Sequence, residues 1–312
     1  MQQNQSLRIL VTGGAGFIGS HTVDVLLAAG HDVVVLDNLS SGKLDNLNLA
    51  HPNLEMIEGD VLEYHFLADL IANCNAVLHL AAIVSVPLSL EQPIYTFQVN
   101  TQGTLHVLQA IHAARRPIRF VFASSAAVYG DPVELPCDDT RSLTAPAISP
   151  YGLQKLQSEQ YADLYARVYD VSSLALRYFN VYGSRQDPNS PYSGVISRFV
   201  KAYREQSDLT IYGDGEQTRD FIHIQDIARA NLMALEHDAT GVLNIATGQQ
   251  VSLLRLISTL TQVGGQKAKV VHEKPRSGDI LASYATTEQA KLSLGFQAST
   301  SLSEGLGELL GK

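Results

Sequence analysis

Hydrophobic positions recur in two patterns over the first 180 residues. Short apolar runs rich in β-branched residues predict strands over Arg8–Thr12, Asp32–Asp37, Leu54–Glu58, Ala76–Leu80, Ile118–Ala123 and Ser173–Tyr178. Several of these runs are apolar on both faces, which is typical of buried strands in a parallel sheet. Longer segments with helical spacing lie between them, over Phe17–Ala29, Thr101–Arg115 and Pro150–Tyr169. This alternation predicts an α/β fold with a doubly wound, Rossmann-type parallel sheet.

The pattern changes after residue 180. A segment rich in Pro, Asn, Ser and Gly predicts a loop over Ser184–Gly194, followed by a short strand and turn over Asp208–Arg219 and a helix near Gln225–Leu235. We therefore expect a smaller C-terminal α/β lobe that binds substrate. We place the cofactor-binding domain at residues 7–179, with a segment near 222–248 returning to it. The substrate lobe then comprises residues 180–221 and 249–312.

Composition narrows the class of protein. The chain has 312 residues and a formal net charge of -9, without a run of Lys or Arg, which argues against a nucleic-acid surface. The only cysteines are Cys74 and Cys137, and the histidines are scattered, so we expect neither a disulfide framework nor a metal site. Residues 1–6 are polar, and no stretch has the roughly 18–20 apolar residues that span a membrane. We expect a soluble cytoplasmic protein without a signal peptide.

A glycine-rich turn follows the first predicted strand. Gly13, Gly16 and Gly19 are three residues apart, which permits a tight turn, close approach of a pyrophosphate and close packing of helix on strand. The first N–H groups of the following helix would bind the phosphates. Asp37 ends the second strand, where a carboxylate accepts hydrogen bonds from the adenosine ribose. Because a carboxylate repels a 2′-phosphate, and no arginine follows before Gly42, the pattern favours NAD over NADP. A glycine-rich turn without a ligand is the alternative.

A tyrosine and a lysine four residues apart begin the third predicted helix. Ser149 is a good N-cap and Pro150 suits the first helical position, so Tyr151 falls in the first turn, at the positive end of the helix dipole. Tyr151 and Lys155 share one face of the helix. A nearby ammonium lowers the pKa of a phenol, which is about 10 for free tyrosine. The same spacing also arises by chance in many helices.

Ser125 joins this pair at the carboxyl end of the fifth strand, where sites in open α/β sheets are found. A serine there can also be a simple turn or cap. With the glycine pattern and Asp37, the three residues predict removal of a proton and a hydride from a hydroxyl-bearing carbon. Tyr151 would be the base, and its pKa must fall by about 3 units for it to act near pH 7. We expect Lys155 and the positive nicotinamide to cause this fall.

The chain resembles the extended short-chain dehydrogenases/reductases that act on nucleotide sugars. It is most similar to the UDP-hexose 4-epimerases, in particular those acting on UDP-GlcNAc and UDP-Glc. The resemblance runs from about Arg8 to the C-terminus and rests on the motifs Gly13–Gly19, Asp37-Asn38-Leu39, Gly59-Asp60-Val61, His79-Leu80-Ala81-Ala82, Asn100, Ser125, Tyr151/Lys155, Arg177-Tyr178-Phe179-Asn180-Val181, Arg219-Asp220-Phe221 and Arg276-Ser277-Gly278-Asp279. It implies NAD as cofactor and a UDP-sugar as substrate. It also implies a homodimer formed through the helices Thr101–Arg115 and Pro150–Tyr169.

The resemblance also assigns residues to the site. The catalytic residues would be Ser125, Tyr151 and Lys155. The cofactor would contact Gly13, Gly16, Phe17, Ile18, Gly19, Asp37, Asn38, Ser40, Ser41, Gly42, Asp60, Val61, Leu80, Ala81, Ala82, Asn100, Tyr151, Lys155 and Phe179. The substrate would contact Ser85, Ser125, Asn180, Gln186, Gly194, Val195, Tyr212, Arg219, Arg276, Asp279 and Ser283. The two arginines suit a diphosphate, because a guanidinium offers a fork of donors.

Two alanines after Ser125 bear on the reaction type. Related 4,6-dehydratases carry an acidic pair where this chain has Ala126 and Ala127, and related decarboxylases usually carry a glutamate there. Alanine can act neither as acid nor as base, so elimination of water is disfavoured and oxidation and reduction at C4 remain.

The sugar is indicated by Ser283, where epimerases restricted to plain hexoses often carry tyrosine. Serine leaves room for an acetamido group, although Tyr284 is next and a shift of one residue would reverse the argument. Ser85 and Gln186 are candidates to hydrogen-bond that group. We predict a 4-epimerase that interconverts UDP-GlcNAc and UDP-GalNAc, with UDP-Glc and UDP-Gal as further candidates. A strict UDP-glucose 4-epimerase, another nucleotide-sugar reductase or dehydratase, and a non-catalytic NAD-binding protein are the alternatives.

Overall fold

The central feature of the computed structural model is a sheet of seven parallel strands. The structure describes residues 6–132, 134–143, 146–188, 194–275 and 280–312. The sheet has the order β11-β6-β5-β4-β1-β2-β3. Its strands are β1 (Arg8–Thr12), β2 (Asp32–Asp37), β3 (Leu54–Glu58), β4 (Ala76–His79), β5 (Arg119–Ser125), β6 (Ser173–Tyr178) and β11 (Gly241–Ile245). The order reverses direction between β1 and β4, which is where ligands bind in such sheets.

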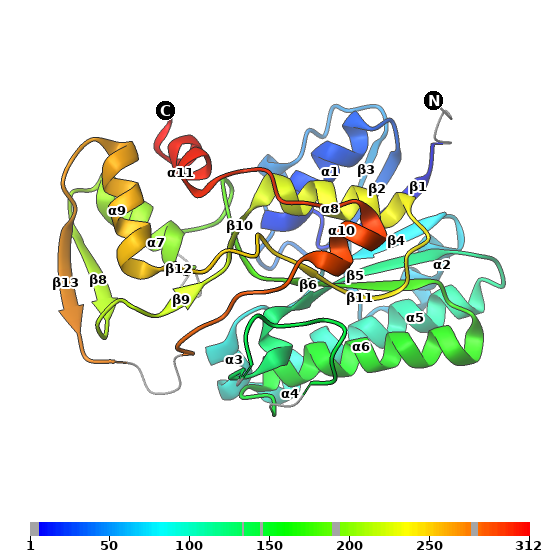
Figure 1. Ribbon diagram of the computed structural model, residues 1–312. Helices are drawn as coiled ribbons and strands as arrows, with labels where there is room; N and C mark the ends of the chain where they lie inside the picture. The colour runs from blue at the N-terminus through cyan, green and yellow to red at the C-terminus, as the bar shows by residue number, and fades with distance from the viewer. Residues whose placement is uncertain (1–5, 133, 144–145, 189–193, 276–279) are drawn as a thin grey trace.

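Helices cover both faces of the sheet (Figure 1). One face carries α1 (Phe17–Ala28), α8 (Ile224–Glu236) and α10 (Glu288–Leu294), and the other carries α2 (Tyr64–Ala72), α5 (Gly103–Ala113) and α6 (Pro150–Tyr169). Successive residues of a strand point to opposite faces, so Ile9 and Val11 enter one core cluster while Leu10 enters the other. The predicted doubly wound α/β fold is confirmed.

Element boundaries differ from the prediction in two places that matter for the site. The helix expected to begin at Thr101 continues a longer helical run made of α3 (Val86–Glu91), α4 (Pro93–Phe97) and a π-helical turn η2 (Gln98–Gln102), before α5. Strand β5 was expected to end at Ala123 but extends to Ser125. Ser124 and Ser125 pair with Arg177 and Tyr178 of β6, so the two serines are strand residues rather than a turn.

A smaller lobe lies beside the sheet (Figure 1). Its helices are α7 (Val195–Arg204), α9 (Leu253–Gly264) and α11 (Leu302–Leu310), and its parallel strand pair is β8 (Asp208–Tyr212) with β13 (Lys269–Glu273). A separate core cluster, including Phe199, Ile211, Leu256 and Leu306, holds them together. Two short pairs complete the lobe: β7 (Asn180–Tyr182) with β10 (Phe221–His223), and β9 (Thr218–Arg219) with β12 (Val251–Ser252). The residue boundaries of the two domains remain a prediction.

The remaining elements are the two short helices η1 (Leu44–Asn46) and η3 (Ala126–Tyr129). Within the described ranges, no helix is both long enough and apolar enough to cross a membrane.

Candidate active site

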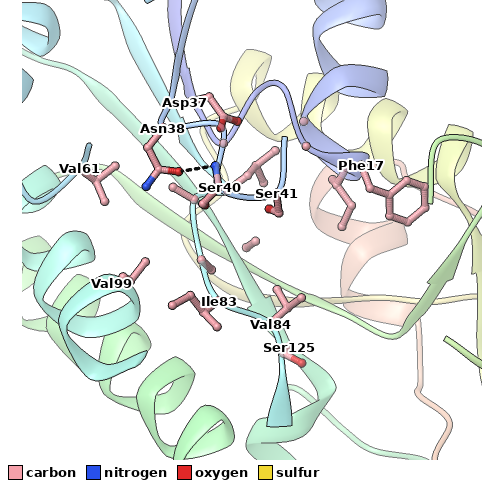
Figure 2. A pocket seen from close by; sticks show the side chains of 18 of the residues that line it. Phe17, Asp37, Asn38, Ser40, Ser41, Val61, Ile83, Val84, Val99 and Ser125 are labelled. Carbon is pink, nitrogen blue, oxygen red and sulfur yellow. Dashed lines mark hydrogen bonds between the residues drawn. The ribbon is translucent and has the colours of Figure 1, made fainter. Parts of the chain in front are cut away.

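A cavity of about 350 Å³ lies at the carboxyl ends of the central strands (Figure 2). Each strand from β1 to β6 ends at or next to a residue of its wall: Gly13, Asp37, Gly59, Leu80, Ser125 and Tyr178. Of the residues predicted to bind the cofactor, all except Gly42 and Asn100 line this cavity. Figure 2 shows side chains from the β1–α1 turn, from the end of β2 and from the end of β5 around one space.

The glycine-rich turn at the end of β1 is packed backbone against backbone. Gly13 has a left-handed conformation (φ +70°), and a Cβ there would lie 2.8 Å from the amide nitrogen of Ala81. A Cβ on Gly19 would lie 2.1 Å from the Gly13 carbonyl oxygen. Helix α1 begins at Phe17, and Gly16, at its N-cap, has no side chain to cover the first N–H groups. These residues can therefore hold a pyrophosphate at the helix N-terminus.

Asp37 is the last residue of β2 and is buried. Its carboxylate accepts hydrogen bonds from the backbone N–H groups of Ala15 (3.0 Å) and Leu39 (2.8 Å). Burial raises the pKa of Asp37, and these two hydrogen bonds partly offset the rise. Gly42 does not line the cavity: a Cβ there would lie 2.9 Å from both Asp37 carboxylate oxygens, so glycine permits the loop to pack on Asp37.

The loop after Asp37 is shaped by polar contacts rather than by basic residues. Asn38 accepts a hydrogen bond from the Ser40 N–H (3.1 Å, Figure 2) and donates one to Asp60 (2.9 Å). Lys155 is the only Lys or Arg in the cavity wall as far as the described residues show. The wall around Asp37 thus offers no cation for a 2′-phosphate.

Asn100 supports the cavity wall without being part of it. Its side chain is buried, accepts a hydrogen bond from the Ile83 N–H (2.7 Å) and donates to the Ile83 carbonyl (3.0 Å) and to Gln154 (2.8 Å). Ile83 lines the cavity. The prediction that Asn100 lies on the cofactor path stays a prediction; in the structure its amide fixes the backbone of Ile83, a residue of the cavity wall.

The predicted catalytic residues meet at one end of the cavity. Ser149 caps α6 by accepting a hydrogen bond from the Gly152 N–H (3.1 Å), which places Tyr151 in the first turn as expected. The buried Tyr151 phenol is hydrogen-bonded to Ser125 at the end of β5. Lys155, also buried, lies one turn further along α6 and donates to the Ala123 carbonyl (2.8 Å).

Electrostatics at this end differ from the expectation. Burial raises the pKa of Tyr151, and the hydrogen bond with Ser125 only partly opposes this. Burial lowers the pKa of Lys155 to about 8, against the opposing effect of Glu159. The prediction that Lys155 and the nicotinamide together lower the pKa of the phenol stays a prediction, because in the protein alone loss of solvent dominates both groups. A further positive charge beside Tyr151 is needed to favour the phenolate.

A buried ion pair that was not predicted from the sequence lies beside these residues. Glu159 and Arg177 are each about nine-tenths buried or more and make two hydrogen bonds to one another. The signal was present in the sequence, since Glu159 follows Lys155 by the same four residues that separate Lys155 from Tyr151. Tyr178 was also missed: its ring lines the cavity while its hydroxyl donates to Asn231 (2.5 Å).

The predicted substrate residues are only partly brought to the cavity. Gln186 lines it together with Ser125. Ser85 does not: its buried hydroxyl caps α3 by accepting from the Leu88 N–H (3.0 Å). Asn180, Gly194, Val195, Tyr212, Arg219 and Ser283 lie outside the wall, near or within the smaller lobe. Arg276 and Asp279 fall outside the described residues.

Two of the substrate residues in the smaller lobe are neighbours. Arg219 in β9 donates to the carbonyls of Thr218 (2.8 Å) and Ile280 (2.7 Å). The Ser283 N–H donates to the same Thr218 carbonyl (3.2 Å). The structure therefore brings the segment 280–283 against β9, although more than 60 residues separate them in sequence.

The two residues that follow Ser125 carry no acid or base. Ala126 and Ala127 form the start of η3 beside Ser125 and carry no ionisable group. In the part of the chain that is described, no three His, Cys, Asp or Glu side chains are grouped so that they could bind a metal ion.

Comparison with known proteins places this site in a family. The model of the NAD dependent epimerase/dehydratase family matches residues 9–246. The structure of UDP-N-acetylglucosamine 4-epimerase from Methanobrevibacter ruminantium M1, in complex with UDP-N-acetylmuramic acid, is 37% identical with a TM-score of 0.94 and covers 98% of each chain. That of UDP-glucose 4-epimerase from Thermotoga maritima, with UDP-glucose, is 37% identical with a TM-score of 0.91 and covers 97% of each chain.

A relative with another activity is more distant. UDP-N-acetyl-alpha-D-glucosaminuronate decarboxylase of Bacillus cytotoxicus is 33% identical over 269 residues, which cover 85% of this chain and 83% of that protein. The family match spans the glycine turn, Asp37 and the Tyr151/Lys155 pair, and both structures cover nearly the whole chain. The chain belongs to the NAD-dependent epimerase/dehydratase family and, within it, to the NAD-dependent UDP-sugar 4-epimerases.

Proposed function

We propose that this epimerase interconverts UDP-GlcNAc and UDP-GalNAc and also turns over UDP-Glc and UDP-Gal. The observation that carries the N-acetylated substrate is the position of Gln186. Its side chain lines the cavity that Ser125 and Tyr151 also line, so it is available to a sugar at the catalytic end.

The amide of Gln186 suits an acetamido group. Its Oε1 accepts a hydrogen bond from the Ser197 hydroxyl, which orients the NH₂ group. Its Nε2 makes only a long contact, 3.4 Å, with the Val181 carbonyl. Because a primary amide has two N–H donors, Gln186 can donate to the acetamido carbonyl oxygen of a substrate.

Small residues favour the same sugar. A Cβ added to Gly194 would lie 3.6 Å from Gln186 Nε2, so glycine leaves space beside this amide. Ser283 lies on the segment against β9 and presents a short side chain. Ser85 contributes no support from the cavity wall, because it lies outside that wall and its hydroxyl oxygen accepts the hydrogen bond that caps α3.

The catalytic residues divide the work at C4 of the sugar. The residues of the cavity wall would hold NAD, which would supply a reversible hydride acceptor for C4. Tyr151 takes the proton of the 4-hydroxyl and gives it back after the 4-keto sugar has turned over in the cavity. Ser125 orients the hydroxyl and Lys155 supplies the buried positive charge. Ala126 and Ala127 cannot move a proton at C5 or C6. The 4-keto sugar is therefore reduced again at C4 and does not lose water.

The UDP moiety would be bound by the smaller lobe. Arg219, which the segment 280–283 holds in place, is one guanidinium for the diphosphate. We propose that Arg276 and Asp279 complete this half of the site, with Asn180, Val195 and Tyr212 beside it. Tight binding of UDP would allow the hexose to rotate.

The test is direct. The purified protein is incubated with UDP-GlcNAc and UDP-Glc separately, and inversion at C4 is followed by NMR. We expect inversion of both. Inversion of UDP-Glc alone would indicate a strict UDP-glucose 4-epimerase, and a 6-deoxy product would indicate a dehydratase. Replacing Gln186 by Ala should reduce turnover of UDP-GlcNAc more than that of UDP-Glc, whereas an equal reduction would remove Gln186 from recognition of the acetamido group.

We also propose that the enzyme is a homodimer, with α6 at the interface. Leu153, Leu164 and Val168 are 46%, 40% and 56% exposed along α6, next to the exposed Tyr161 and Tyr169. Helix α5 offers a smaller apolar surface to a partner, because Leu108 and Ile111 are buried in its own core and Leu105 is partly buried. Light scattering should give twice the chain mass, and Leu164→Glu should give a monomer; a monomeric wild type would contradict the proposal.

A further inference from the structure

Three consecutive residues at the end of β5 are each tied to one face of α6. Tyr151, Lys155 and Glu159 follow one another at four-residue spacing on that face. Tyr151 is hydrogen-bonded to Ser125, and Lys155 donates to the Ala123 carbonyl (2.8 Å). The Ser124 hydroxyl between them donates to Glu159 Oε1 (2.5 Å). The first two α6 residues belong to the proposed reaction, whereas Glu159 has no role in it so far.

Glu159 is buried, and its negative charge is paired with the positive charge of Arg177. Its Oε1 accepts from Arg177 Nε (2.9 Å) and its Oε2 accepts from Arg177 Nη2 (2.7 Å), which is a bidentate ion pair between α6 and β6. Both side chains are only 6% exposed. Burying a carboxylate costs folding free energy unless the carboxylate is paired in this way. Apolar residues at these two positions would often give the same or a higher stability, so stability alone does not explain the ion pair.

The ion pair extends to the segment that follows Ser125. Arg177 Nη1 donates to the Tyr129 hydroxyl (2.8 Å), and the guanidinium lies 4.8 Å from the centre of that ring. The Tyr129 hydroxyl donates in turn to Asn244 at the end of β11 (2.8 Å). Glu159 is thus the end of a buried network that fixes both sides of Ser125, through Ser124 and through η3.

Glu159 also supplies negative charge to Lys155. The described groups that interact electrostatically with the ammonium are Glu159, one turn further along α6, and His79 on β4. Burial together with Lys155 lowers the pKa of His79 to about 3, so that His79 is neutral. Glu159 alone opposes the effect of burial on the pKa of Lys155.

We propose that Glu159 is a positioning residue of the epimerase, which keeps the buried Lys155 ammonium charged and, through Ser124 and Arg177, fixes the strand end that carries Ser125. The inference rests on the proposed function for its effect on turnover. Lys155 must stay protonated while Tyr151 is a phenolate, and because the side chain is buried, solvent gives its ammonium little stabilisation. The Glu159 carboxylate meets this need, because it lies one helical turn from Lys155 and is held in place by Ser124 and Arg177.

The charge and the shape of Glu159 are separated by two substitutions. Glu159→Gln keeps the length and one acceptor oxygen but removes the charge. Glu159→Asp keeps the charge but shortens the side chain. Asp163→Asn is the matched control, since Asp163 is the next acidic residue on α6, 64% exposed and paired with Arg167. Because Glu159→Gln leaves Arg177 buried without its partner, the double variant Glu159→Gln/Arg177→Met provides a neutral pair for the case in which the single variant does not fold.

The readout in turnover is the pH profile of kcat/KM. Activity is lost at high pH as Lys155 loses its proton. Without the Glu159 charge this loss begins at lower pH, by about one unit, which is the size of effect expected for removing a neighbouring charge. The double variant should show the same shift, while Glu159→Asp and Asp163→Asn should keep the wild-type alkaline limb. A purely structural role predicts the opposite, with the wild-type profile restored in the double variant.

A second readout needs neither substrate nor turnover. Side-chain NMR of ¹⁵N-labelled lysine, with the Lys155 signal assigned through Lys155→Met, gives the pKa of Lys155 directly. We expect that pKa to be lower in Glu159→Gln and in the double variant than in the wild type. An unchanged pKa would overturn the proposal even if turnover falls. A lowered pKa in a protein that inverts no UDP-sugar would leave the role of Glu159 standing and reject the proposed function.

Discussion

The cofactor half and the sugar half of the site are built in different ways. As we propose it, the cofactor half lies along the ends of β1, β2, β3, β4 and β6, and all of its residues that line the cavity, except Tyr151 and Lys155 on α6, follow closely after a strand end. The proposed sugar half depends on short strand pairs of two or three residues and on segments far apart in sequence, such as 218–219 and 280–283. The first half is therefore encoded mostly by residues close in sequence, whereas the second is assembled by tertiary contacts.

The difference between the two halves agrees with what each half has to do in the proposed reaction. A cofactor that stays bound needs a fixed binding site, and backbone packing at Gly13 and Gly19 provides one. A hexose that must present both faces needs room to turn, and in the proposed function the small residues Gly194 and Ser283 leave that room. Changes in the cofactor half should therefore affect all substrates alike, while changes in the sugar half should separate one substrate from another.

The largest effect is expected for Tyr151→Phe. Removing the phenolic oxygen takes away the group that moves the C4 hydroxyl proton, so kcat should fall by about 10²–10⁴ for every UDP-sugar. The content of bound NAD, measured after denaturation, should be unchanged, because the ring still fills the same space. Tyr161→Phe, on the exposed side of α6, is the control and should leave kcat unchanged. Unchanged turnover in Tyr151→Phe would exclude Tyr151 as the base.

Lys155→Met should abolish turnover and yet stabilise the fold. Lys155 has a pKa of about 8 in the folded protein, below its ordinary value of 10.5. Between these two pH values the unfolded chain binds more protons, so stability rises with pH, and below about pH 8 the full cost of burying the ammonium is present. Met removes a cost of about 3 kcal/mol at pH 7.

Urea unfolding of the wild type and of Lys155→Met, at pH 7 and at pH 10, measures the free-energy cost of burying the ammonium. The gain in unfolding free energy should be largest at pH 7 and should shrink towards pH 10. Lys291→Met, at an exposed position of α10, should change stability by no more than about 0.5 kcal/mol. A Lys155→Met protein less stable than wild type at pH 7 would show that the hydrogen bond to Ala123 outweighs the burial of the charge.

Gly19→Ala tests the backbone packing of the cofactor half. The new Cβ would clash with the Gly13 carbonyl oxygen, so unfolding free energy should fall by about 1–3 kcal/mol and NAD affinity should fall with it. Gly307→Ala is the matched control in another helix, α11, where the nearest atom to a Cβ is 3.8 Å away. Calorimetry with NAD titration distinguishes the two, and equal behaviour of both variants would mean that the turn can adjust.

Ser283→Tyr should have the smallest but most selective effect. A bulky ring on the segment against β9 should lower kcat/KM for UDP-GlcNAc by about tenfold or more, as expected for loss of space for a small substituent. Turnover of UDP-Glc should be nearly unchanged, and competition between the two sugars in one NMR tube measures the ratio. An equal loss for both sugars would place Ser283 away from the C2 substituent.

The same contrast explains how far the sequence could predict the structure. The strands and α6 followed from hydrophobic periodicity and from Ser149 and Pro150, because those signals act within a few residues. The use of Ser85 as a helix cap and of Asn100 as a brace for Ile83 could not be seen, since both depend on which backbone group lies opposite in the folded chain. The raised pKa of Tyr151 has the same origin, because burial is a property of the whole fold.

A single site should remove the hydride from C4 and return it to the same sugar, without elimination of water. Two samples of the same UDP-sugar are mixed with the enzyme: one is deuterated at C4, and the other has no deuterium but carries ¹³C in the ring. Both epimers of each sample are then analysed by NMR and mass spectrometry. We predict that deuterium stays at C4 in the inverted product and does not pass to the ¹³C sugar. Loss of deuterium to water, or its exchange between the two sugars, would contradict the account.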